Sequence, residues 1–155
     1  MNITKVKKDG DKIIIRWSED ADTSEKKTDF ACYDPPLDSF TEAFEALGPA
    51  ALGLIMAPHA WRSLAKVSGV SITHEEDRIG AVITLLVDLD GATKGPLVIN
   101  TPYLVDEDEN GPMMPPDMLN AVDAIMKEAE KYVRGERAQR DFFADDAADS
   151  ESEAA

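Results

Sequence analysis

The chain has 155 residues, and 43% of them are hydrophobic, which is enough for one domain with a buried core and too much for a chain disordered throughout. Its 31 acidic residues outnumber 16 basic ones, for a net charge of -15, which argues against direct binding of bare DNA or RNA because phosphate contacts depend on lysine and arginine. The single cysteine, Cys32, excludes an intrachain disulfide, and no apolar run has the length of a signal peptide or a membrane span. We therefore expect a cytoplasmic protein.

The N-terminal part predicts an antiparallel meander. Residues 3–6 and 12–17 are rich in β-formers and flank Asp9-Gly10, a strong hairpin signal. Residues 28–33 alternate apolar and polar side chains, as in a third strand. Residues 19–27 between them are expected to form a polar connection.

A helical segment should follow this meander. Asp38 or Ser39 is the expected N-cap of a helix that ends near residue 47. Gly48-Pro49 predicts a break in that helix, because proline removes a backbone donor. Residues 50–56 are apolar on nearly every side and predict a short second helix that is buried.

The middle of the chain predicts more of the sheet. Residues 66–74 and 79–89 are two β-runs joined by a charged turn. The second run has few polar breaks, which predicts a central strand buried on both faces. Residues 97–100 form a last short strand, and residues 105–116 an irregular acidic loop.

The last helix is expected from Asp117, its cap, to about Arg134, with Gly135 either as its C-cap or as a break before a short continuation. No internal repeat is visible. The pattern predicts an α+β fold, with an antiparallel sheet of about five or six strands and helices packed on one face. Residues 1–143 would form this single domain with its binding peptide, followed by a disordered acidic tail, 144–155.

A short peptide between the last helix and the tail is the strongest candidate for a binding site. Gln139, Arg140, Asp141, Phe142 and Phe143 combine a two-way hydrogen-bonding group, charges and two adjacent aromatic rings. Burying one phenylalanine is worth about 1.5–3 kcal/mol, so both rings should find an apolar surface. That surface is either a pocket on a partner or the hydrophobic face of the last helix.

The same five residues resemble the bacterial sliding-clamp-binding peptide, whose usual form is Gln-Leu-(Ser/Asp)-Leu-Phe. Gln139, Asp141 and Phe143 match it, Phe142 is hydrophobic in the fourth place, and Arg140 departs from the usual leucine. The resemblance implies that Gln139 occupies a polar subsite of the clamp. Phe142 and Phe143 would then fill its hydrophobic pocket.

Two further segments are similar to a set of small uncharacterised phage and prophage proteins. They are residues 97–102 and residues 135–139, while the rest of the chain is similar only loosely. The resemblance implies a viral accessory protein that belongs to a replication or recombination module. It implies no known activity.

An acidic loop traces part of a calcium-binding pattern. Its oxygen-bearing residues and its glycine turn are Asp106, Asp108, Asn110, Gly111 and Asp117. The final position holds aspartate in place of the longer glutamate, and nearby prolines restrict the backbone. These features favour a solvated loop over a metal site, and no cofactor is expected.

A metal-dependent enzyme, another possible function, would need paired carboxylates. Asp88 and Asp90 flank a strand end and could hold Mg²⁺ if Glu75 and Glu76 converge on them. The alternative is an ordinary turn.

The favoured hypothesis is a non-enzymatic phage accessory protein that docks on the host sliding clamp through Gln139, Asp141, Phe142 and Phe143. It would recruit itself to replication forks or compete with host factors, a form of host takeover. One alternative is an acidic inhibitor of a host nuclease or anti-phage defence complex, including by mimicry of nucleic acid. Another is a metal-dependent enzyme that uses Asp88 and Asp90. The pattern does not predict the oligomeric state.

Overall fold

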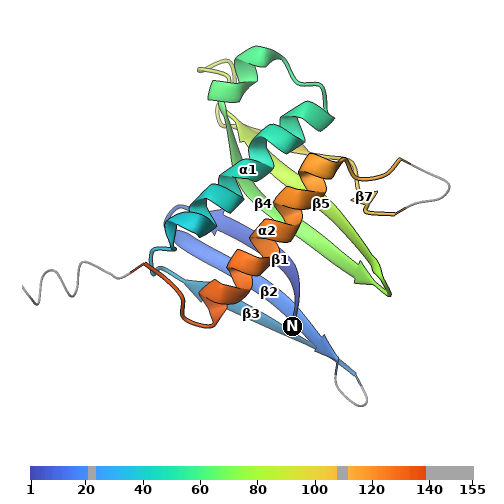
Figure 1. Ribbon diagram of the computed structural model, residues 1–155. Coiled ribbons are helices and arrows are strands. Elements are labelled where there is room, and N and C mark those ends of the chain that lie inside the picture. Colours follow the sequence, from blue (N-terminus) through green and yellow to red (C-terminus); the bar gives the residue numbers. More distant parts are fainter. Residues whose placement is uncertain (21–23, 108–111, 139–155) are drawn as a thin grey trace, which may run out of the picture.

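The computed structural model describes residues 1–20, 24–107 and 112–138. It shows an antiparallel sheet of seven strands with two α-helices, α1 and α2, side by side on one face (Figure 1). The elements in chain order are β1 (Asn2–Asp9), β2 (Lys12–Asp20), β3 (Glu25–Cys32), α1 (Asp38–Leu54), the 3₁₀ helix η1 (His59–Ser63), β4 (Ala65–Glu75), β5 (Arg78–Val87), β6 (Leu97–Asn100), β7 (Leu104–Val105) and α2 (Pro116–Val133). The predicted α+β class, with helices on one face, is confirmed.

The sheet consists of two units with the same topology. β1, β2 and β3 form a meander followed by α1, and β4, β5 and β6 form a meander followed by α2 after the short β7. The strand order is β3-β2-β1-β4-β5-β6, so in each unit the first strand lies at the centre and the third at the edge. β1 and β4 pair antiparallel at the junction of the two units. The fold thus repeats about this junction although the sequence shows no repeat.

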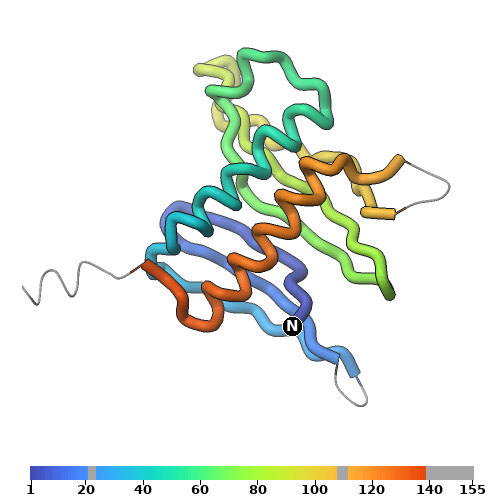
Figure 2. Tube along the Cα trace, in the orientation of Figure 1, coloured from blue at the N-terminus to red at the C-terminus, as the bar shows by residue number. Residues whose placement is uncertain are grey.

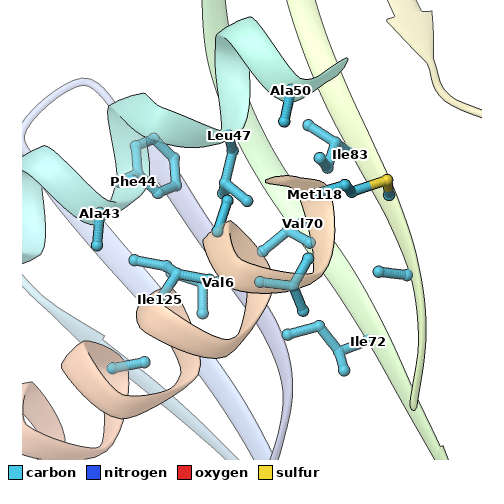
Figure 3. Close-up of a cluster of buried hydrophobic side chains, with 14 of the residues drawn as sticks. Val6, Ala43, Phe44, Leu47, Ala50, Val70, Ile72, Ile83, Met118 and Ile125 are labelled. Carbon is cyan, nitrogen blue, oxygen red and sulfur yellow. The ribbon is translucent and has the colours of Figure 1, made fainter. Parts of the chain in front are cut away.

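The hydrophobic core lies between the two helices and the sheet (Figure 3). Leu47 of α1 and Met118 and Ile125 of α2 are fully buried, as is Val6 of β1 beneath them. Because side chains of both units interleave in one core, the two halves are expected to fold as one domain.

Helix α1 runs without interruption from Asp38 to Leu54, so the predicted break at Gly48-Pro49 is wrong. The residues on either side of Pro49 pack on the sheet, since Leu47 and Ala51 are fully buried. A proline inside a helix costs about 3 kcal/mol, which the burial of these neighbours offsets.

The predicted N-caps are also wrong. Leu37 occupies the N-cap of α1 and Pro115 that of α2, and neither cap is made by a side chain. The Ser39 hydroxyl instead donates to a carboxylate oxygen of Glu128 at 2.9 Å, which links the two helices. Helix α2 begins with Pro116, whose ring sets φ for the first turn and whose missing N–H would have no partner there.

The predicted glycine C-cap is confirmed. Gly135 has φ +100°, a conformation that side chains with a Cβ rarely adopt. Its N–H bonds to the Tyr132 carbonyl at 3.1 Å, and the N–H of Glu136 bonds to the Lys131 carbonyl at 2.9 Å. This pair of bonds is the Schellman motif that ends α2.

Strand β5 is not buried on both faces. Its residues beneath the helices are buried, whereas the alternating residues Val82, Thr84 and Leu86 are half-buried. In the described part of the chain no helix covers that second face, which explains the difference. An apolar run alone cannot show whether a second layer is present.

The predicted connection at 19–27 is shorter than expected. β2 continues to Asp20 and β3 already begins at Glu25, where the two strands pair. Most residues of β3 are exposed, and opposite charges face each other across the ladder, as in the ion pair between Arg16 and Asp29. The acidic loop at 105–116 likewise contains the end of β7, which pairs with β5.

Candidate functional site

The predicted binding residues Gln139, Asp141, Phe142 and Phe143 lie outside the described residues. The described chain ends at Ala138, directly before them. What the structure shows is therefore how the peptide is attached to the domain, near the entry to α1 (Figure 2).

Backbone and side-chain hydrogen bonds fix this attachment point. The Ala138 N–H donates to the Pro35 carbonyl at 3.0 Å. Arg137 donates from Nη1 to a carboxylate oxygen of Asp34 and from Nε to the Tyr132 carbonyl, both at 3.0 Å. The chain is thus bonded to the segment that joins β3 to α1.

Aromatic rings complete the attachment. The guanidinium carbon of Arg137 lies 5.3 Å from the ring centroid of Phe30 and 4.9 Å from that of Tyr132, within the range of cation–π contacts. The Tyr132 hydroxyl donates to the Asp34 carbonyl at 2.6 Å, and burial raises the pKa of this phenol. We call the five residues Phe30, Asp34, Pro35, Tyr132 and Arg137 the C-terminal anchor.

Sequence patterns alone do not reveal the C-terminal anchor. Tyr132 belongs to the apolar face of the last helix, but nothing in the sequence marks Asp34 or Arg137 as its partners. They are 103 positions apart in the chain, and a single sequence contains no signal for a pair at that distance.

The hydrophobic face of α2 is largely occupied, which bears on the expected alternative that Phe142 and Phe143 cap this helix. Met118, Ile125 and Tyr132 on this face are at most 1% exposed beneath α1 and against the sheet. Along its flank, three residues are only partly buried: Leu119, Met126 and Val133. Capping by the phenylalanines would be confined to that flank.

The calcium candidates are only partly described. Asp108 and Asn110 fall outside the described residues, and Asp117 lies in the first turn of α2. Asp106 accepts backbone N–H bonds from Ile79 at 3.0 Å and from Glu107 at 2.9 Å, a structural role that ties the loop to β5. Over residues 1–20, 24–107 and 112–138, no three His, Cys, Asp or Glu side chains are placed to hold a metal ion.

Asp88 and Asp90 form a turn. An Asp88 carboxylate oxygen accepts the Asp90 N–H at 3.0 Å, and Asp90 has φ +58°. Glu75 and Glu76 lie at the opposite end of β5, a strand of 10 residues, so they are about 30 Å away along the sheet. The convergence of these four acids, which a metal site needed, does not occur.

Within the described residues, no helix has the length and apolar character needed to cross a membrane. The chain matches no protein-family model, and comparisons with curated proteins and with solved structures found no match. The geometry of the C-terminal anchor is thus the main guide to function.

Proposed function

We propose that this chain is a non-enzymatic binding protein that docks on a protein partner through Gln139, Asp141, Phe142 and Phe143. Because this peptide resembles the sliding-clamp-binding peptide, the proposed partner is the bacterial sliding clamp. The observation that carries the proposal is the C-terminal anchor, which holds the residue directly before the peptide.

Anchoring favours binding for an entropic reason. A peptide attached through a long loose linker loses much conformational freedom when it docks. Here Arg137 and Ala138 are already bonded to the domain, so the peptide starts from a fixed point. Because the fold already fixes Arg137 and Ala138, the attached peptide loses less conformational entropy on binding than a free peptide would.

The filled core supports the same proposal. The buried face of α2 is covered by α1 and the sheet, so this helix offers Phe142 and Phe143 only its partly buried flank. A clamp pocket that accepts both Phe142 and Phe143 would bury their apolar surface, with Gln139 fixing the register.

The charge of the chain fits recruitment through a protein. With a net charge of -15 the molecule is not suited to hold DNA by itself, whereas docking on the sliding clamp would bring it to replication forks. As the phage accessory protein that its sequence resembles, it would act in the cytoplasm of a bacterial host. It would recruit itself to forks or displace host factors from the clamp.

A deletion separates this proposal from the acidic-inhibitor hypothesis. Removing residues 139–155 keeps Ala138 and the C-terminal anchor, so the domain should unfold at an unchanged temperature. We expect surface plasmon resonance to show complete loss of binding to the sliding clamp. If the chain that lacks residues 139–155 binds the clamp as tightly as the full chain, the acidic surface of the domain makes the interaction.

A further inference from the structure

A second candidate binding surface lies beside the C-terminal half of α1. A groove of ≈ 980 Å³ opens between this half-helix, the η1 segment and the start of β4, within the size range of ligand-binding clefts. The β1–β2 turn forms its other wall through Lys8 and Gly10.

The groove coincides with a split in the sheet. The ladder between β1 and β4 ends at the pair Lys7–Gly69, although β4 begins at Ala65. Over residues 65–68, no described strand pairs with β4 on the side of β1, and the two strands diverge there (Figure 2). An unpaired strand edge of this kind can accept an extended peptide by backbone hydrogen bonds.

The lining of the groove is apolar in its interior, and its rim carries three cations and one exposed carboxylate, Glu45. The interior includes Phe44, Leu52, Val67 and Leu86, and the Met56 side chain at the edge is 88% exposed. The exposed cations at the rim are Lys8, Arg62 and Lys66, none of which forms an ion pair with another described residue. On a chain of net charge -15, this combination selects an extended acidic segment with a large apolar side chain.

We propose that the groove binds residues 141–146 of a second copy of the chain. This segment, Asp-Phe-Phe-Ala-Asp-Asp, places two aromatic rings between acidic residues. Phe142 or Phe143 would lie against the apolar interior, and the aspartates would face the three cations. The inference rests on the phenylalanines of the proposed function but assigns them a different receptor, so that clamp binding and self-binding would compete.

Reach favours a second copy as the donor, because the same copy reaches only the near end of the groove, around Phe44. Ala138 is held beside Pro35, ahead of the first turn of α1, and Gly53 lies about 22 Å further along that helix. A fully extended chain from Ala138 spans about 14 Å at Phe142 and about 18 Å at Phe143. The Cα atoms of Phe142 and Phe143 in the same copy therefore fall short of Gly53, at the far end of the groove.

The binding test uses a fluorescein-labelled synthetic peptide of residues 138–147 as probe. The acceptor is the full chain carrying Phe142→Ala and Phe143→Ala, so that its own segment cannot compete. We expect saturable binding by fluorescence anisotropy that weakens as salt is raised, because the rim contacts are exposed charges. Failure of the probe to bind this acceptor would overturn the proposal.

A substitution that fills the groove keeps the test independent of folding. A Cβ built on Gly53 meets no heavy atom within 4 Å, so Gly53→Leu fits the helix and occupies the groove. Leucine is also the better helix former, so thermal unfolding should occur at the same or a higher temperature. We expect at least tenfold weaker binding of the probe, and unchanged affinity would contradict the assignment.

Charge reversal tests the rim. Lys8→Glu with Lys66→Glu should weaken probe binding at least tenfold. The matched control, Lys26→Glu with Lys27→Glu, changes the charge equally on β3, outside the groove, and should leave the affinity within twofold. Equal losses in both variants would mean that only net charge matters and would overturn the site.

Two further measurements separate this proposal from clamp binding. Sedimentation velocity of the unmodified chain should show association that rises with concentration and disappears on Phe142→Ala/Phe143→Ala. A chain that stays monomeric well above the dissociation constant of the probe would overturn the second-copy assignment. Gly53→Leu keeps the peptide and should still bind the clamp, so loss of self-binding alone identifies the groove.

Discussion

Arg137 makes three kinds of contact at once, and arginine is the side chain suited to do so. Its flat guanidinium stacks on Phe30 and Tyr132 while its N–H groups reach Asp34 and a carbonyl. Lysine carries the same charge but cannot stack and form a planar fork. The shape of the group, in addition to its charge, therefore holds the start of the C-terminal peptide.

Arg137→Lys should lower the free energy of unfolding by about 1–2 kcal/mol, because the stack and one or two hydrogen bonds are lost. Urea denaturation measures this, and hydrogen exchange of the Ala138 amide should become faster. The control is Arg134→Lys, whose side chain is 65% exposed in a pair with Glu130, where a change within about 0.5 kcal/mol is expected. Equal effects at the two positions would contradict the role of the C-terminal anchor.

Tyr132 should make stability sensitive to alkali. Burial raises the pKa of its phenol in the folded chain above the value of about 10 in the unfolded chain. Above pH 10 the unfolded state therefore loses this proton first, and the free energy of unfolding falls as pH rises. Tyr132→Phe should lose about 1 kcal/mol at pH 7, where the Asp34 carbonyl lacks its donor, but decline less above pH 10. If the free energy of unfolding falls equally above pH 10 in the unmodified chain and in Tyr132→Phe, the Tyr132 phenol does not cause the fall.

Residue-level roles were predictable only where the cause is local. Gly135 could be assigned from the sequence because a helix C-terminus of this type needs a residue that tolerates positive φ. The pairing of Asp34 with Arg137 and the hydrogen bond from Ser39 to Glu128 depend on how distant segments pack. No local rule contains that information.

At the scale of elements, α1 shows tertiary packing overriding a local break. Pro49 is exposed on a helix whose opposite side is buried, and its ring leaves the Glu45 carbonyl without the usual i+4 donor. Pro49→Ala should therefore raise the free energy of unfolding by about 1–3 kcal/mol. Thermal and urea unfolding, with Ala46→Ser on the exposed face as a control for surface effects, would measure this gain. A loss of stability would instead show that proline acts by restricting the unfolded chain.

The strands illustrate which patterns are informative. Alternation and the Asp9-Gly10 turn predicted the β1–β2 hairpin, and the apolar runs predicted β4 and β5. The start of β3 was missed because its charged residues resemble a loop, although an exposed edge strand tolerates them. An apolar run also does not show which strands are neighbours, so the position of β5 beside β6 could not be predicted.

At the scale of the whole molecule, the fold separates two binding surfaces. Two equivalent meanders meet at β1 and β4, and both helices cover the same face (Figure 1). The C-terminal anchor lies at the N-terminal end of α1, and the groove lines the other half of this helix. The sequence could suggest the peptide, but not the groove, because the groove arises where paired strands diverge.

The central claim is that residues 139–143 bind a protein partner while the domain positions them. The most direct measurement is isothermal titration calorimetry of the purified chain with a bacterial sliding clamp, beside a Gln139→Ala/Phe142→Ala/Phe143→Ala variant and an Asp149→Ala/Glu151→Ala control in the acidic tail. We predict micromolar or tighter binding, about -8 kcal/mol or better, by the unmodified chain and the tail control. The triple variant should keep its unfolding temperature and lose the interaction. No binding by the unmodified chain, or equal binding by the triple variant, would contradict the proposed function.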